Sequence, residues 1–197
     1  NAAADIEFKF PFGFKELEGI HSRTDFDLSA HEKFSGRKLQ YFDPERNENY
    51  VPYVVETSIG LDRMFLALFS ICLKDEVLED GSERTVLSLP PALAPVKAAI
   101  LPLVKKDGLP EFAEKIFNDL KYDFNVISEE KDSIGKRYRR QDAIGTPFCI
   151  TVDHDSLADN TVTLRERDTM KQERVKVEDL RRIIDEKVNF RTLLSKI

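Results

Sequence analysis

The sequence is poor in the residues that build disulfide frameworks and metal centres. Its 197 residues contain two cysteines, three histidines and no tryptophan. Cys72 and Cys149 both lie inside apolar segments, so we expect buried thiols in a reducing cytosol rather than a disulfide. The histidines lack the short spacing that is typical of zinc ligands, and we therefore expect no metal site. They are His21, His31 and His154.

The sequence also lacks long apolar runs and an excess of positive charge. No run approaches the ~18 residues that a membrane-spanning helix needs, so we expect a cytoplasmic protein with no membrane partner. The formal net charge of −6 argues against a chain that coats nucleic acid indiscriminately, although it leaves room for a local basic patch. A hydrophobic share of 41% beside 34% charged residues is typical of a folded globular protein.

The chain shows two different patterns of predicted secondary structure. The first segment runs from Asp5 to about Leu78 and is rich in strand-like stretches, and the polar stretch KDEVLEDGSERT is the best candidate for a linker. Beyond it, strands alternate with amphipathic helices such as LPEFAEKIFNDLKYD and VEDLRRIIDEKV. This alternation predicts an α/β layer structure of roughly 110 residues. We therefore predict two domains that meet near this polar stretch.

The stretch VETSIGLDRMFLALF predicts a strand followed directly by a helix. The strand is expected to end at Glu56. Apolar residues recur at helical spacing after Gly60, which indicates an amphipathic helix. Thr57 or Ser58 is suited to the N-cap of that helix, because a short hydroxyl side chain can accept a hydrogen bond from a free backbone N–H of the first turn.

Acidic residues of two strands can meet at this junction. Glu56 and Ser58 are two apart, so they share one face of an extended strand. Glu16 and Glu18 share a face of an earlier strand in the same way. If the two strands pair antiparallel, their carboxylates converge beside Arg63, where they can hold an ammonium group while the guanidinium contacts a nucleotide. The alternative is a structural ion pair between Glu56 and Arg63, with Ser58 serving only as a helix cap.

The stretch IGKRYRRQDAIG is the densest basic cluster of the chain. Its cations surround an aromatic residue, Tyr138, on one short helix. Single-stranded nucleic acid is bound by such combinations, with phosphates on the cations and bases stacked on the aromatic ring. The alternative is a solvated helix face with Tyr138 packed into the core. The four cations predicted to contact RNA are Lys136, Arg137, Arg139 and Arg140.

A second group of arginines lies in the stretch LRERDTMKQERV. Alternation places Arg165 and Arg167 on the same face of a strand. On periodicity alone, we interpret this segment as the exposed end of a surface strand. Thr169 to Lys171 would then form the turn that follows it.

Five stretches, taken in order, resemble the glycyl-tRNA synthetases of the homodimeric class II type. They are KELEGIHSRTDFDL, VETSIGLDRMFLALF, LPPALAPVKAAILPL, SIGKRYRRQDAIGTPFCITVD and VTLRERDTMKQERV. ETSIGLDR is similar to the third class II signature, and ELEGIHSRTDFDL is more specific to the glycine enzymes. The resemblance implies a C-terminal fragment with an α/β fold. Its anticodon-binding domain, residues 84–197, with a mixed five-stranded sheet and flanking helices, would follow part of an antiparallel-sheet catalytic domain, residues 1–83.

The resemblance also implies the ligands and the residues that hold them. ATP, a substrate, would be bound by Glu16, Leu17, Gly60, Leu61, Asp62 and Arg63. Glycine would be bound by Glu56, Thr57, Ser58, Ile59 and Gly60. No catalytic residue and no metal ligand is assigned, although Mg2+ is expected to accompany ATP in the full-length enzyme. The implied partners are tRNA-Gly, glycine, ATP and a second copy in a homodimer.

The implied activity is the activation of glycine with ATP to glycyl-adenylate and the transfer of glycine to tRNA-Gly. The first two class II signatures are not visible in the sequence, so we expect this chain alone to be inactive. The alternative is a non-enzymatic, synthetase-like nucleic-acid-binding protein of the polymerase-accessory or regulatory type. Such a protein has no need of Glu16, Glu56 and Arg63 together, and their joint presence favours the ligase.

Overall fold

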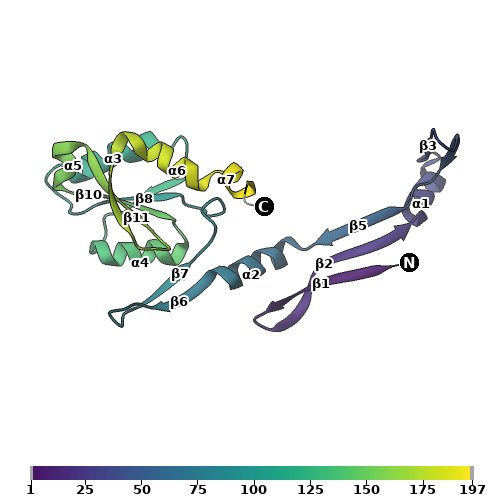
Figure 1. Cartoon of the computed structure of the whole chain (residues 1–197), viewed down its shortest axis with the longest axis horizontal. Coiled ribbons are helices and arrows are strands. Elements are labelled where there is room, and N and C mark those ends of the chain that lie inside the picture. Colours follow the sequence, from purple (N-terminus) through teal and green to yellow (C-terminus); the bar gives the residue numbers. More distant parts are fainter. Residues whose placement is uncertain (1, 196–197) are drawn as a thin grey trace. The chain divides into compact units, whose positions relative to one another are not determined.

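The computed structural model describes residues 2–195 and forms two compact units (Figure 1). The first unit is Asn1–Ser70 and the second is Ile71–Ile197. The division falls inside helix α2 (Leu61–Cys72). The predicted boundary between domains 1–83 and 84–197 lies further along the chain and stays a prediction. Among the described residues, none of the helices is long and apolar enough to cross a membrane.

The first unit is built on a three-stranded antiparallel sheet with the order β1-β2-β5. Its strands are β1 (Ala3–Phe10), β2 (Gly13–Thr24) and β5 (Val54–Ile59). The pairing of β2 with β5 is the antiparallel arrangement that the sequence analysis considered. Between these strands the chain forms helix α1 (Phe26–Ser35) and a small hairpin of β3 (Tyr41–Asp43) and β4 (Glu48–Tyr50).

Strand β2 is interrupted by two irregularities of register. Against β1 the register shifts at Leu17, and against β5 it shifts at Arg23. In each place one residue of β2 is extra relative to the partner strand, which is the pattern of a β-bulge. A bulge breaks the strict alternation of side chains and so re-aims its neighbours. The two bulges flank the segment of β2 that lies opposite Glu56.

Strand β5 is longer than the sequence predicts. It continues through Ile59, and helix α2 begins at Leu61 directly after Gly60. The predictions that the strand ends at Glu56 and that Thr57 or Ser58 caps the helix are therefore wrong. Thr57 and Ser58 have extended backbones paired with β2, so these residues precede the helix by too far to cap it.

The predicted linker is a β-hairpin. The stretch KDEVLEDGSERT covers most of strand β6 (Leu73–Val77), the turn after it and the start of strand β7 (Glu83–Leu87), and the two strands pair antiparallel. Gly81 adopts a left-handed φ of 78° in the turn, and the Asp80 carboxylate accepts a hydrogen bond from the backbone N–H of Ser82 at 2.9 Å. The linker prediction is wrong because every second residue of β7 packs inward although the stretch is polar: Arg84 and Val86 are both buried.

The second unit contains a mixed five-stranded sheet with the order β12-β11-β10-β8-β9. Strands β9, β8 and β10 run parallel, whereas β10, β11 and β12 pair antiparallel. The predicted α/β fold, with a mixed five-stranded sheet and flanking helices, is confirmed. The strands are β8 (Ala98–Pro102), β9 (Val126–Ser128), β10 (Phe148–Val152), β11 (Thr161–Glu166) and β12 (Gln172–Lys176).

Helices cover both faces of this sheet. Alternation along β8 sends Ala98 and Ile100 into the larger core cluster, together with residues of α3 and α6, and sends Ala99 and Leu101 toward α4. Figure 1 shows α4 on the opposite side of the sheet from α3 and α6. The helices of this unit are α3 (Leu109–Leu120), α4 (Ile134–Ile144), α5 (His154–Asp159), α6 (Leu180–Val188) and α7 (Phe190–Leu194), with a 3-10 turn at Val177–Asp179.

The buried thiol of Cys149 gives a test of this packing. Cys149 lies in β10 with 1% of its surface exposed, and burial raises the pKa of its thiol to about 12. Because the protonated thiol is favoured in the fold, its contribution to stability is present below the unfolded pKa of about 8.5 and is lost as the pH rises toward 12. At pH 8 we expect iodoacetamide to label Cys149 slowly in the folded chain and rapidly in urea, as measured by peptide mass spectrometry. Equal rates would contradict this packing.

Candidate functional site

Glu56 lies on a polar face of the sheet formed by β2 and β5. Its cross-strand partner is His21, and the next residue on the same face of β5, Ser58, lies opposite Gly19. The Oε2 atom of Glu56 is 3.2 Å from the Nε atom of Arg23. Side chains that are directly opposite in an antiparallel pair share a face. A carboxylate, a hydroxyl, an imidazole and a guanidinium are therefore gathered on one side of the sheet.

The structure brings Glu16, but not Glu18, to this face. Glu18 pairs with Ile59, so its side chain belongs to the opposite side of the sheet. Glu16 lies beyond the bulge at Leu17, and its Oε1 atom is 3.6 Å from the place that a Cβ atom on Gly19 would occupy. The bulge thus re-aims Glu16 toward the face that carries Glu56.

Arg63 reaches the same strand from helix α2. Its Nη1 atom donates to the backbone carbonyl oxygen of Glu16 at 2.5 Å. The ion pair of Glu56 is made with Arg23 and not with Arg63. The structural alternative of a Glu56–Arg63 pair with a helix-capping Ser58 is therefore not found among the described residues.

The remaining residues predicted to bind glycine or ATP are distributed around this junction. Thr57 and Ile59 alternate with Glu56 and Ser58, so their side chains lie on the other face of β5. Gly60 separates β5 from α2, and a Cβ atom there would lie 3.7 Å from the Cβ of Arg63. The other three predicted residues are Leu17 at the bulge, Leu61, which is exposed, and Asp62 in the first turn of α2.

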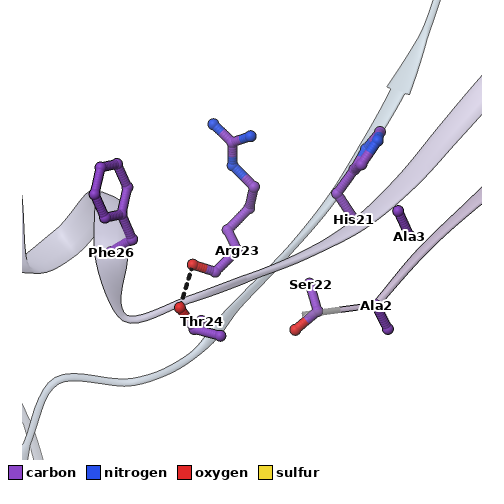
Figure 2. Close-up of a pocket in the computed structure, with 7 residues that line it drawn as sticks. All are labelled: Ala2, Ala3, His21, Ser22, Arg23, Thr24 and Phe26. Atoms are coloured by element: carbon purple, nitrogen blue, oxygen red, sulfur yellow. Dashed lines mark hydrogen bonds between the residues drawn. The ribbon is translucent and has the colours of Figure 1, made fainter.

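A pocket lies beside this face, around the side chain of Arg23. Figure 2 shows the guanidinium extending from β2 between Phe26 and His21, with the Thr24 hydroxyl donating to the Arg23 carbonyl oxygen. Arg23 Nε also donates to Asp27 at 2.9 Å. The hydrogen bond that Arg23 donates to Asp27 is the largest influence that raises the pKa of Arg23, followed by the charges of Asp27 and Glu56. The pocket is lined by Ala2, Ala3, His21, Ser22, Arg23, Thr24 and Phe26.

The basic helix α4 uses one of its predicted RNA-binding side chains inside the fold. Arg137 is 2% exposed. Its Nη1 atom donates to the carbonyl oxygens of Pro102 and Glu129 at 2.7 and 3.1 Å, and its Nη2 atom donates to that of Leu103 at 3.2 Å. The side chain therefore ties together the loops that follow β8 and β9. In this structure it is not available to an RNA phosphate.

Two further cations of α4 have protein partners. Arg140 binds the carboxylates of Glu129 and Asp132, at 2.6 and 2.9 Å, and their hydrogen bonds raise the pKa of its guanidinium. Arg139 donates to the carbonyl oxygen of Glu83 and to the hydroxyl of Ser82 in the β6–β7 hairpin. Of the four predicted RNA contacts, Lys136 is the one whose residue is exposed.

Tyr138 packs against other residues of the protein, as the alternative interpretation of this helix predicted. Its hydroxyl is 2.6 Å from that of Thr151, and the guanidinium carbon of Arg165 lies 4.8 Å from the centre of its ring. Burial, the largest influence, raises the pKa of its phenol. The ring is therefore stacked on an arginine of the protein rather than presented to a base.

Arg165 in β11 and Arg167 just after it are buried, so their interpretation as part of a surface strand end is wrong. Arg165 donates twice to the Asp142 carboxylate, at 2.8 and 2.9 Å, and Arg84 of the β6–β7 hairpin adds a third bond at 3.1 Å. Asp142 itself is 0% exposed. Arg167 donates to the carbonyl oxygens of Gly145 and Leu89. Buried charges of this kind are stable because nearly every donor meets an acceptor.

A different surface of the second unit has the geometry of a binding edge. The carboxyl ends of the parallel strands β8, β9 and β10 meet there, and the chain leaves β8 and β9 for helices on opposite faces of the sheet. Ligands of open α/β sheets bind at such a switch point. The loops at this edge carry exposed lysines, three of which the sequence analysis missed: Lys105, Lys106 and Lys131, beside Lys136. These lysines are identified from the strand order of the sheet, and no local sequence motif marks them.

Comparisons with known proteins place these features in a family. Residues 97–187 match the family described as anticodon binding domain. The chain is 58% identical over 173 residues to a glycine–tRNA ligase of Chlorobaculum tepidum, covering 88% of this chain and 37% of that protein. It is 56% identical over 190 residues to a glycine–tRNA ligase of Macrococcus caseolyticus, covering 96% of this chain and 41% of that protein. The chain belongs to the glycine–tRNA ligase family.

The chain spans about two fifths of the length of the ligases that it matches, so it corresponds to a part of such a protein. A solved structure titled RNA binding domain of threonyl-tRNA synthetase from Cryptosporidium parvum has the same fold, with a TM-score of 0.66. It is 20% identical, and the match covers 94% of this chain and 42% of that one. The prediction of the glycyl-tRNA synthetase family is confirmed. Both relatives, from Chlorobaculum tepidum and Macrococcus caseolyticus, are glycine–tRNA ligases, which favours this family over a non-enzymatic accessory protein.

Replacing Asp142 tests the buried arginine network of this ligase segment. In Asp142→Asn the charges of Arg84 and Arg165 lose their shared carboxylate, and we expect the free energy of unfolding to fall by about 3–5 kcal/mol. Asp155→Asn, which removes an exposed carboxylate of α5, is the matched control and should change it by less than about 0.5 kcal/mol. Urea unfolding measures both. Similar losses in the two variants would contradict a structural role for Asp142.

Proposed function

We propose that this chain is part of a ligase that activates glycine with ATP and transfers it to tRNA-Gly. The observation that carries the proposal is the placement of Glu16, Glu56 and Arg63 at one strand–helix junction. In the first step a glycine carboxylate oxygen attacks the α-phosphorus of ATP and pyrophosphate leaves. In the second step a hydroxyl of the tRNA displaces AMP from the glycyl-adenylate.

The face that carries Glu56 supplies the glycine half of this site. The Glu56 carboxylate takes the ammonium group of glycine, and the Ser58 hydroxyl on the same face hydrogen-bonds the substrate. Charge-assisted hydrogen bonds of this type are about twice as strong as neutral ones. Gly19 lies opposite Ser58, and a Cβ atom there would come within 2.7 Å of the His21 ring. There is thus no room for a side chain at Gly19, and a site this crowded suits the smallest amino acid as its substrate.

The junction with α2 supplies the ATP half. The bond from Arg63 to the Glu16 carbonyl oxygen fixes the plane of the guanidinium. A planar cation held in this way offers a flat surface on which the adenine ring stacks. Leu17, Gly60, Leu61 and Asp62 complete the surroundings of the nucleotide in the proposal. Within residues 2–195 no cluster of three or more potential metal ligands forms, and the Mg2+ expected with ATP in the full-length enzyme is assigned to no residue of this chain.

The second unit supplies the tRNA contacts. We place the anticodon nucleotides at the carboxyl edge of β8, β9 and β10. The amino groups of Lys105, Lys106, Lys131 and Lys136 neutralise RNA phosphates there. Arg137 and Arg140 support this surface indirectly, because they fix the loops that carry Lys131 and Lys105. A second copy of the ligase, in a homodimer of the full-length enzyme, remains part of the proposal.

The chain alone is expected to lack activity. The class II signature that normally supplies the arginine for the α-phosphate is not visible in the sequence. We expect glycine-dependent exchange of pyrophosphate into ATP at background level for the chain, and readily measured exchange for a full-length ligase containing it. In that ligase Glu56→Gln should raise the KM for glycine by about tenfold or more, with the KM for ATP nearly unchanged. Exchange by the isolated chain above background would refute the division of the site.

Lysine substitutions test the RNA surface. Replacing Lys105, Lys106, Lys131 and Lys136 together by alanine should weaken binding of tRNA-Gly by about tenfold or more and lower the salt dependence of binding. The control variant replaces four exposed lysines on other surfaces by alanine, with the same change of charge: Lys115, Lys121, Lys171 and Lys187. Fluorescence anisotropy with labelled tRNA-Gly and a non-cognate tRNA measures both. Equal loss in the two variants would show that only net charge matters.

A further inference from the structure

Glu56 forms an ion pair with Arg23, which also binds a second carboxylate. Arg23 Nε lies 3.2 Å from Glu56 Oε2 and 2.9 Å from Asp27 Oδ2. The three side chains come from three elements, β5, β2 and the first turn of α1. Arg23 and Asp27 both lie in the stretch ELEGIHSRTDFDL, but neither is among the residues predicted to bind glycine or ATP. The resemblance therefore gives this contact with Glu56 no role.

The local backbone is shaped to place Arg23 at this point. Arg23 is the extra residue at the register shift of β2 against β5. The next residue, Thr24, has a left-handed φ of 53°, which is uncommon for a β-branched residue. This turn leads directly into α1, so that Asp27 returns to Arg23 four residues later. A bulge that re-aims one side chain toward a functional carboxylate is a recurrent device beside binding sites.

The charge balance of the three groups suits the capture of a cation. An arginine bound only to Glu56 would neutralise that carboxylate and weaken its attraction for an ammonium group. Asp27 is the nearer partner of Arg23 and shares its charge. The group of three retains one net negative charge, while Arg23 Nε still orients the Glu56 carboxylate.

We propose that Asp27 and Arg23 are positioning residues for glycine binding: Arg23 orients Glu56, and Asp27 keeps Arg23 from cancelling its charge. The inference rests on the proposed role of Glu56 as the ammonium ligand. If Arg23 and Asp27 only linked α1 to the sheet, replacing them would lower stability alone. A positioning role predicts a selective change in glycine affinity.

The test uses the full-length ligase that contains this chain, assayed by pyrophosphate exchange at varied glycine and at varied ATP. In Asp27→Asn, Arg23 keeps Glu56 as its one charged partner among these groups. We expect the KM for glycine to rise about three- to tenfold, with kcat and the KM for ATP within about twofold of the unsubstituted enzyme. Asp27→Glu should restore most of the affinity. Asp25→Asn is the matched control, because Asp25 is an exposed carboxylate beside α1 that accepts a hydrogen bond from Ser29.

A double-mutant cycle shows whether Asp27 acts through Arg23. In an Arg23→Gln background, Asp27→Asn should have little further effect on the KM for glycine. An undiminished effect in that background, or equal effects of Asp27→Asn and Asp25→Asn, overturns the inference. Melting temperatures identify any variant that fails to fold, and Asp27→Ser then replaces Asp27→Asn.

The variant Glu56→Gln separates this inference from the function on which it rests. If Glu56→Gln leaves the KM for glycine unchanged, the proposed glycine site is wrong. If Glu56→Gln raises that KM while Asp27→Asn does not, the glycine site stands and the positioning role of Asp27 and Arg23 is refuted.

Discussion

The Asp142 carboxylate organises the second unit, because two guanidinium groups from different elements depend on it. Arg84 reaches it from β7 and Arg165 from β11, while Asp142 itself belongs to α4. Without this carboxylate Arg165 would lose its charged partner in a buried position and Arg84 would keep only Glu76, and breaking a buried pair in this way costs about 3–5 kcal/mol. These bonds thereby connect the β6–β7 hairpin, helix α4 and the five-stranded sheet. For the same reason, much of the positive charge in this unit is used for folding rather than for recognition.

In the first unit a comparable constraint acts through the register of β2. Pairing with β5 places His21 opposite Glu56 and Gly19 opposite Ser58. The bulges at either end of this segment turn Glu16 and Arg23 toward the same face. A slip of one residue would send every one of these side chains to the other side of the sheet. The proposed glycine site therefore depends on backbone register as much as on the identity of its side chains.

The sequence predicts the α/β fold of the second unit and the helix after Gly60, because hydrophobic periodicity records which residues face a core. It does not predict that Arg165 and Arg167 are buried, since a pattern of alternation treats every charge as solvent-facing. Their acceptors, such as Asp142 and the carbonyl of Gly145, are distant in the sequence. The bulge at Arg23 is not predicted from the sequence either, because register is a property of two paired strands. Thr57 and Ser58 resemble helix caps locally, and the strand pairing overrides that preference.

We propose for the second unit that RNA binds at the carboxyl edge of the parallel strands, while the arginines of α4 and those at the end of β11 hold the fold. Backbone amide chemical shifts, followed by NMR as an anticodon stem-loop of tRNA-Gly is added, test this claim most directly. We expect the largest changes in residues 103–108, 129–136 and 153–155. Unchanged shifts there, with the largest changes instead in the hairpin and in the part of α4 that packs on it, would contradict it.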